Sequence, residues 1–349
     1  MTRLPIGRRR KALYAALVTL TTLAVAELGA RGFVAAAVNP RWRHHEQLVA
    51  AVGLPALNEI LEPDPELFWR LRANVEARRV TGAVGDSGQL AFTVSTDAAG
   101  RRITPGGVDD GGTARRVLLL GDSCTFGLGV ESDRTFAALL QERLPDTRCI
   151  NAGVPGYSSF QGHHQFDEME LARPPVATIV TFLFNDKSHW DGRSDPEQAA
   201  ARRGVGAWLA RHSRLFQLLA ALVRGTPDPA ADSPQAPQVR RERLSDREYE
   251  VELRAIVRRC ATLGSTPILV VWPLRSQIGG GDGDRAARRK QEVVRRLAGE
   301  LELPLVDLVA TFRGAAASGL FLDVVHANER GHALVAGAIE PVLRPILSR

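Results

Sequence analysis

The chain has 349 residues, of which 44% are hydrophobic, and its formal net charge at pH 7 is +6. This length and apolar content exclude a disordered protein and allow one large domain, or a catalytic domain with a smaller appendage. The basic residues are almost all arginines scattered among acids, which indicates a solvated surface, so nucleic acid is not expected as a partner. Three cysteines, Cys124, Cys149 and Cys260, show neither a disulfide framework nor metal-ligand spacing, although one pair can bridge if the domain is exported.

The N-terminus predicts a membrane segment. Basic residues 8–11 precede an uncharged run, Ala12 to Ala26, and a second apolar patch extends from Gly32 to Val38. Positive charge before an apolar segment keeps the N-terminus in the cytoplasm and directs the downstream residues across the membrane. We therefore expect residues 1–38 to be a single-pass signal anchor in a bacterial cell membrane, with the rest of the chain outside the cytoplasm.

Cleavage of this segment is the alternative. As a helix the uncharged run spans only about 22 Å, shorter than the hydrocarbon layer. Its end, Ala24-Val25-Ala26, has the small residues of a signal-peptidase site, and cleavage there would give a secreted or periplasmic protein. Glu27 and Arg31, four positions apart, can pair on one helix face and let the helix continue to Val38. This pairing favours an uncleaved anchor.

Residues 39–113 predict a small strand-and-turn appendage or linker. Pro63-Asp64-Pro65 is a turn signal, residues 90–94 alternate in polarity, and residues 106–112 are rich in Gly and Asp. We expect this part to have a structural role.

An α/β domain is predicted over residues 114–349. Short apolar strands are expected at Val117–Leu120, Cys149–Ile150, Val176–Leu183, Pro267–Trp272 and Leu305–Leu308. Helices are expected at 134–144, 160–171, 245–263 and 284–301, with a final helix that begins after the N-cap residue Asn328. Such alternation favours a parallel sheet covered on both faces. Residues 187–244 interrupt it as an insertion, with an amphipathic helix near 205–224 and an exposed loop at 226–238.

Polar or small residues come after several of the predicted strands. Ser123 comes after the buried run Val117–Leu120 and Gly121, while Gly153 and Asn185 come after the next two strands. Because the carboxyl ends of parallel strands meet at one sheet edge, these residues are expected close together. Ser123 is the candidate nucleophile, and a serine hydroxyl needs both a base and an oxyanion site. The alternative is an ordinary strand-to-helix turn in which Asp and Ser act as caps.

The chain resembles the SGNH/GDSL hydrolase family in four blocks over roughly residues 115–345. The blocks are Gly-Asp-Ser-Cys-Thr-Phe-Gly from 121, Asn-Ala-Gly-Val-Pro-Gly-Tyr from 151, Phe-Asn-Asp from 184 and Asp-Val-Val-His from 323. The resemblance implies a flavodoxin-like three-layer α/β/α sandwich with about five parallel strands, no metal and no cofactor. The leader and the stretch Glu62–Leu67 resemble the membrane-anchored members. One departure is Leu183, which stands where the family's third block usually has glycine.

The resemblance also implies roles for individual residues. Ser123 would be the nucleophile, His326 its base, and Asp323 the carboxylate that orients the imidazole. The oxyanion hole would consist of the backbone N–H groups of Ser123 and Gly153 and the side-chain amide of Asn185. By the same resemblance, Asp122 and Asp186 would be structural partners that hold the loops. His189 and Trp190, which follow the third block, are expected to line the substrate cleft. Among the other residues, His332 is expected to be packed, His163 and His164 to be solvated, and Cys124 to be buried.

These observations predict an extracytoplasmic serine ester hydrolase that acts through an acyl-serine on a carboxylic ester, with a short acyl group on a carbohydrate or a lipid. One alternative is an O-acetyltransferase of envelope polysaccharide, with a sugar hydroxyl in place of water. A second is a non-catalytic envelope binding protein, which only Leu183 supports. The run Gly279–Gly281 lacks the Gly-Lys-Ser/Thr ending of a phosphate-binding loop.

Overall fold

The computed structural model describes residues 8–37, 55–83, 89–106, 114–144, 146–189, 192–202, 241–278, 284–315 and 319–349, with isolated positions between 209 and 219. The described residues divide into two compact units. One draws on residues 1–42 and 197–239, and the other on residues 43–196 and 240–349. Each unit is described by itself.

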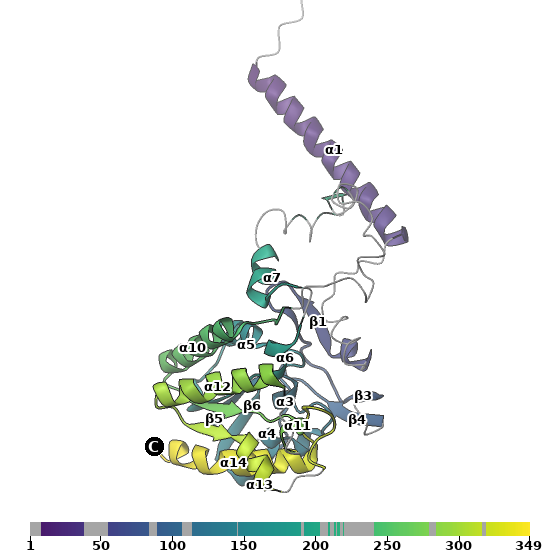
Figure 1. The fold of residues 1–349 in the computed structure, drawn as a ribbon. Helices are drawn as coiled ribbons and strands as arrows, with labels where there is room; N and C mark the ends of the chain where they lie inside the picture. The colour runs from purple at the N-terminus through teal and green to yellow at the C-terminus, as the bar shows by residue number, and fades with distance from the viewer. Residues whose placement is uncertain are drawn as a thin grey trace, which may run out of the picture. The chain divides into compact units, whose positions relative to one another are not determined.

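The first unit is built on one long helix, α1 (Arg8–Ala37), drawn in purple in Figure 1. Its 30 residues span about 45 Å, and the stretch Arg10–Arg31 is long and apolar enough to cross a membrane, as a signal sequence also is. Arg31 Nε donates to Glu27 Oε1 at 2.9 Å, so the predicted ion pair and the continuation of the helix beyond it are confirmed. The second oxygen of Glu27 accepts a hydrogen bond from the Ser213 hydroxyl at 2.8 Å.

A five-stranded parallel sheet forms the centre of the second unit. Its strands are β5 (Arg115–Gly121), β6 (Thr147–Asn151), β7 (Ala177–Thr181), β8 (Thr266–Val271) and β9 (Leu305–Asp307), in the order β6-β5-β7-β8-β9. This is the flavodoxin-like order, and the predicted fold is confirmed. Leu119 in β5 lies opposite Asn151 on one side and Ile179 on the other. The side chains of β7 are all buried, as expected for a strand covered on both faces.

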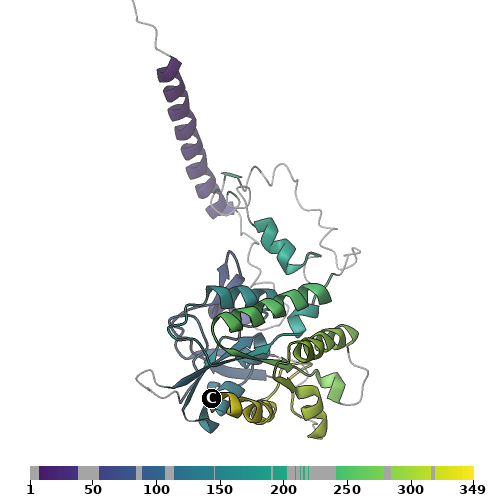
Figure 2. The same ribbon diagram turned by 90° about the vertical axis from the view of Figure 1, so that its left-hand side faces the viewer.

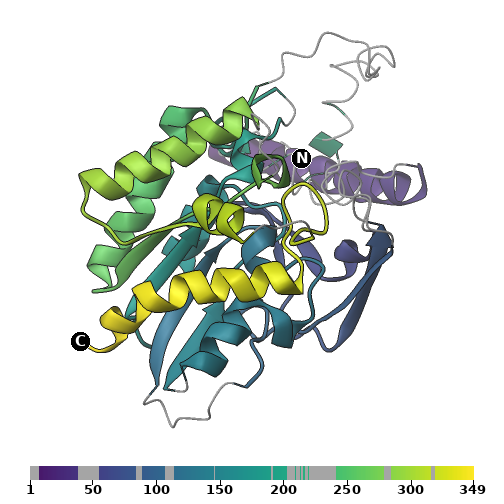
Figure 3. The same ribbon diagram turned by 60° about the horizontal axis from the view of Figure 1, so that its bottom comes forward.

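Helices cover both faces of the sheet (Figures 1 and 2). One layer contains α5 (Ser159–Glu168), α10 (Asp246–Thr262) and α12 (Arg285–Glu300), and the other contains α4 (Phe136–Arg143), α13 (Leu308–Gly314) and α14 (Glu329–Leu347). Figure 3 shows α14, in yellow, running across one face. Local signals begin these helices: Ser158 and Ser245 form capping boxes for α5 and α10, and the Asn328 side chain accepts from the Gly331 N–H.

Two antiparallel hairpins precede the sheet and give residues 55–94 the predicted strand-and-turn character. A 3-10 turn, η1 (Pro55–Glu59), is followed by β1 (Leu61–Asp64) with β2 (Phe68–Leu71) and by β3 (Arg78–Ala83) with β4 (Gln89–Val94). Asp64 closes the first hairpin, since its Oδ1 accepts from the backbone N–H groups of Glu66 and Leu67. Both hairpins belong to the same compact unit as the sheet. The domain boundary at residue 113 stays a prediction.

The predicted insertion leaves and re-enters the second unit at one place. His189 bridges to Glu242, and the Arg243 N–H donates to the Ser188 carbonyl at 2.8 Å. The described part of the insertion contains α7 (Asp195–Arg202). Most of the helix expected near 205–224 lies outside the described residues. The loop at 226–238 and the glycines at 279–281 lie entirely outside them.

Candidate active site

The turn after β5 places Ser123 at the first position of a single helical turn, α3 (Ser123–Phe126). Gly121 is required before it, because a Cβ there would lie 2.1 Å from Thr125 Oγ1 and 2.5 Å from the Thr181 carbonyl oxygen. Asp122 caps α3, with Oδ1 accepting from the Cys124 N–H at 2.9 Å. The N–H of Ser123 has no partner within the helix, since the first turn of a helix leaves its amides free.

The structure brings Ser123, His326 and Asp323 together in one chain of hydrogen bonds. His326 Nε2 lies 2.8 Å from Ser123 Oγ, and His326 Nδ1 lies 2.6 Å from Asp323 Oδ2. The other carboxylate oxygen, Oδ1, accepts from the N–H groups of Val325 and His326 at 2.8 and 2.7 Å. Asp323 therefore holds both the ring and the backbone of His326, so that Nε2 faces the serine.

The carboxylate of Asp323 is kept in its charged form. Burial alone would raise its pKa, but the hydrogen bonds and the charge of His326, together with the Val325 N–H, outweigh burial and lower the pKa below its ordinary value. An ionised carboxylate at Nδ1 places the proton of a neutral imidazole on that nitrogen and leaves Nε2 as an acceptor for the serine proton.

The two other candidate oxyanion donors already have acceptors. The Gly153 N–H donates to Asn151 Oδ1 at 3.0 Å, and Asn185 Nδ2 donates to Asp122 Oδ2 at 3.2 Å. The Asn185 amide has a second hydrogen, whereas the single N–H of Gly153 must be shared with any further acceptor. Gly153 has no room for a side chain, because a Cβ there would lie 2.3 Å from the Phe126 nitrogen of α3.

Asp122 and Asp186 hold the loops beside these donors, which is the structural role expected for both residues. Asp186 Oδ1 accepts from both the N–H and the hydroxyl of Ser159, which ties α6 (Phe184–Lys187) to α5. Burial raises the pKa of Asp122 to about 6 and that of Asp186 to about 7. Both carboxyls therefore ionise less readily than exposed ones.

Leu183 fits its position without glycine. Its φ of −170° lies outside the left-handed region that favours glycine, and its side chain is buried in the main hydrophobic core. Strand β7 ends two residues earlier than predicted, because residues 182 and 183 lead into α6 instead of continuing the ladder. The departure from the family pattern thus supplies core packing.

A small cavity of about 50 Å³ adjoins Ser123, His326 and Asn185. The rest of its lining is Leu57, Leu128, Pro155, Gly156 and Phe184. Sequence reasoning missed Leu57, which comes from η1, far from the four motif blocks, and no local pattern marks it.

A buried network holds the loop that contributes Pro155 and Gly156. Trp69 Nε1 donates to the Pro155 carbonyl at 3.0 Å, and Arg243 Nη1 donates to the Gly156 carbonyl at 2.7 Å. Arg243 also forms an ion pair with Asp195 at 2.6 Å, with both side chains almost fully buried. The hairpin β1–β2 and the end of the insertion therefore both support this wall of the cavity.

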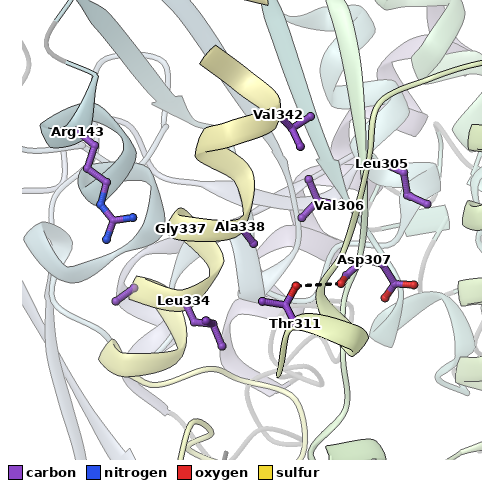
Figure 4. A pocket seen from close by; sticks show the side chains of 10 residues that line it. Arg143, Leu305, Val306, Asp307, Thr311, Leu334, Gly337, Ala338 and Val342 are labelled. Carbon is purple, nitrogen blue, oxygen red and sulfur yellow. Dashed lines mark hydrogen bonds between the residues drawn. The ribbon is translucent and has the colours of Figure 1, made fainter. Parts of the chain in front are cut away.

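A larger groove, of about 550 Å³, borders α14, the end of α4 and strand β9 (Figure 4). Its lining is mainly aliphatic, and its charged members are engaged: Arg143 with Glu340 at 3.5 Å and Asp307 with Arg295 at 2.8 Å. The Thr311 hydroxyl donates to the Asp307 carbonyl. The chemistry of the predicted site therefore lies at the smaller cavity.

The other histidines and Trp190, for which the sequence predicted a place, lie outside the lining of the small cavity or outside the described part of the chain. His332 is buried, accepts from the Phe136 N–H at Nδ1, and has its pKa lowered to about 3 by burial, so it is a packed neutral histidine as expected. His163 corrects an expectation: it is half-buried and bonded to Glu252 at 2.6 Å, because α5 packs on α10. His189 is exposed and does not line the cavity, and Trp190 lies outside the described residues.

The cysteines are three buried free thiols, so no disulfide forms among them. Burial raises the pKa of the Cys124 thiol well above its ordinary value, which fits a packing residue beside Ser123. In the described part of the chain, no group of three His, Cys, Asp or Glu side chains is arranged to hold a metal ion.

The sheet has the flavodoxin-like order, and a hydrogen-bonded serine, histidine and aspartate lie at its carboxyl edge, an arrangement typical of serine hydrolases. Residues 119–334 match the profile of the GDSL-like Lipase/Acylhydrolase family. The match covers more than half of the chain, which therefore belongs to this family of esterases and acylhydrolases.

Solved structures with a similar fold include three bacterial proteins. A lipolytic protein of the G-D-S-L family from Veillonella parvula is 16% identical (66% of this chain, 99% of that chain, TM-score 0.45). A lipase/acylhydrolase from Enterococcus faecalis is 17% identical (67% and 96%, TM-score 0.44), and an acetylxylan esterase from Geobacillus stearothermophilus is 20% identical (67% and 95%, TM-score 0.43). No curated protein matches the chain.

Proposed function

We propose that the chain is a serine ester hydrolase that forms an acyl-enzyme on Ser123. The observation that carries the proposal is the unbroken hydrogen-bond chain from Ser123 Oγ through the His326 imidazole to the Asp323 carboxylate. Each member has the partner its role requires: the nucleophile touches a base, and the base is held by a carboxylate.

In the first half of the reaction, Ser123 Oγ attacks the ester carbonyl carbon while His326 Nε2 takes the hydroxyl proton. The tetrahedral intermediate carries its negative charge on the former carbonyl oxygen. The Ser123 N–H, the Gly153 N–H and the free hydrogen of the Asn185 amide are the proposed donors to this oxyanion. His326 then gives the proton to the departing alcohol, which leaves an acyl group on Ser123.

In the second half, water takes the place of the alcohol. His326 removes a proton from the water as its oxygen attacks the acyl carbon, and the same donors stabilise the second oxyanion. Collapse returns the proton to Ser123 Oγ and releases the carboxylic acid. Asp323 stays ionised throughout and stabilises the imidazolium in both halves.

The proposed location is the outer face of a bacterial cytoplasmic membrane, with α1 as the anchor. Two features support this topology: the basic residues 8–11 at the start of the apolar stretch Arg10–Arg31, and the Glu27–Arg31 pair. An ester on a carbohydrate or lipid of the envelope is the proposed substrate, since such a molecule lies within reach of an anchored enzyme.

The test uses the full chain, purified in detergent, with p-nitrophenyl acetate. Wild type and a Ser348→Ala control, which changes an exposed serine at the C-terminus, are expected to hydrolyse the ester at equal rates. Ser123→Ala and His326→Ala are expected to lose at least about 1,000-fold in kcat/KM. Equal rates for all four proteins would refute the proposal.

A fusion test addresses the topology. A C-terminal reporter that fluoresces only in the cytoplasm should remain dark, and the mass of the purified chain should include residues 1–38. Bright cells would refute export, and a mass that begins after Ala26 would show cleavage in place of anchoring.

A further inference from the structure

One wall of the cavity beside Ser123 is a residue from outside the matched family region. Leu57 is 0% exposed and belongs to η1, whereas the family match begins at residue 119. The other apolar members of the lining are Leu128, Pro155 and Phe184, which follow the turn of the nucleophile or lie near Gly153 and Asn185 in the chain. Leu57 is therefore the lining residue that comes from a segment separate in the chain from the loops that hold Ser123, Gly153, Asn185 and His326.

The cavity is partly open to solvent, and the reaction decides which half of an ester can occupy its walled part. The alcohol must depart and water must then arrive at the same face of the acyl carbon, next to His326. That side of the site has to be open to solvent in every cycle. The acyl group, by contrast, stays in place through both halves of the reaction, so the walled part of the cavity, at Leu57, suits the acyl side.

The size of the cavity limits that acyl group. Its volume of about 50 Å³ is far below the roughly 300 Å³ or more of an ordinary small-molecule pocket. A methyl group fits such a space, whereas a longer chain must displace a wall. Because protein interiors are close-packed, a buried leucine such as Leu57 does not give way without cost.

We propose that Leu57 sets the acyl-chain specificity of the enzyme, admitting acetyl esters and excluding longer acyl groups. This inference rests on the proposed function, because it assigns the acyl side of the same site. It also gives the N-terminal segment a part in substrate selection beyond its support of the fold.

The test compares p-nitrophenyl acetate, butyrate and hexanoate with the full chain in detergent. Leu57→Ala enlarges the cavity, and Leu57→Val does so by one methylene with less risk to folding. Ile60→Ala is the matched control, since Ile60 is equally buried beside η1 but does not line the cavity. The butyrate-to-acetate ratio of kcat/KM is expected to rise at least about 10-fold in Leu57→Ala, several-fold in Leu57→Val and not at all in Ile60→Ala.

The outcomes separate this inference from the proposed function. An unchanged ratio in Leu57→Val and Leu57→Ala, with hydrolysis still dependent on Ser123, overturns the specificity role alone. An equal rise in Ile60→Ala also overturns it, because the effect would then be general loosening. If wild type and Ser123→Ala hydrolyse every ester at equal rates, the proposed function fails and the specificity role fails with it. Should Leu57→Ala not fold, the Leu57→Val ratio decides.

Discussion

His326 Nε2 lies 2.8 Å from Ser123 Oγ, although 203 positions separate the two residues in the chain. The residue next to the histidine explains how this contact is held. The carbonyl of Val325 accepts from Trp272 Nε1 at 2.9 Å and from the Cys124 thiol at 3.8 Å. One anchor therefore comes from the end of β8 and the other from the nucleophile turn itself.

Loss of the Trp272 donor should loosen His326, with only a partial loss of core packing in the phenylalanine variant. Trp272→Phe removes the N–H but keeps most of the ring, and an unpaired buried carbonyl costs about 1–3 kcal/mol. We expect kcat on p-nitrophenyl acetate to fall by about 10-fold, with KM nearly unchanged. Unchanged kcat in a folded variant would contradict this positioning role.

The carboxylate of Asp323 is predicted to matter through ring orientation. Asp323→Asn is expected to lower kcat by at least about 100-fold, because an amide can hold the ring in the wrong tautomer and cannot stabilise the imidazolium. The control is Asp133→Asn, which changes an exposed aspartate and should leave kcat as it is. Similar kcat values for the two variants would argue against the triad.

Asn185 tests the proposed oxyanion site. Asn185→Ala is expected to reduce kcat by about 100- to 1,000-fold, since one donor to the developing charge is lost. Asn185→Asp keeps the shape but replaces the donor with a carboxylate beside Asp122, so it should be no more active than the alanine variant. Near-normal activity in Asn185→Asp would show that only the shape of Asn185 matters.

Asp186 should make stability depend on pH in an unusual direction. Its folded-state pKa is raised by burial to about 7, above the ordinary value of 3.8, so its contribution is fully present below pH 4 and is lost as pH rises through 7. The loss in the free energy of unfolding is roughly 4 kcal/mol, because a pKa difference of one corresponds to about 1.4 kcal/mol. The Tm of Asp186→Asn minus that of wild type should therefore rise between pH 4.5 and 8. A constant difference, like the one expected for Asp133→Asn, would contradict the raised pKa.

The buried pair of Arg243 and Asp195 is predicted to be strongly coupled. Either Arg243→Met or Asp195→Asn alone leaves a buried charge without its partner and should cost about 3–5 kcal/mol in the free energy of unfolding. The double variant should cost much less than the sum of the two. Additive costs in urea unfolding would show that the two charges do not stabilise each other.

Local patterns in the sequence determined the strand and the turn that present Ser123. The apolar run Val117–Leu120 predicted a buried strand because its burial on both faces requires unbroken hydrophobicity. Gly121 and Asp122 predicted the turn, because a missing side chain and a capping carboxylate act on backbone within a few residues. The order of the motif blocks predicted the family and the sheet.

Tertiary structure alone decided what closes the site and what supports it. Leu57, Trp69 and Arg243 reach the cavity or its loop from segments far away in the chain, and no periodicity or cap marks them. His163 was wrongly expected to be solvated for the same reason, since its partner Glu252 lies on another helix. Helix and turn signals act over a few neighbouring residues, whereas these contacts exist only after the hairpin and the insertion have packed against the sheet.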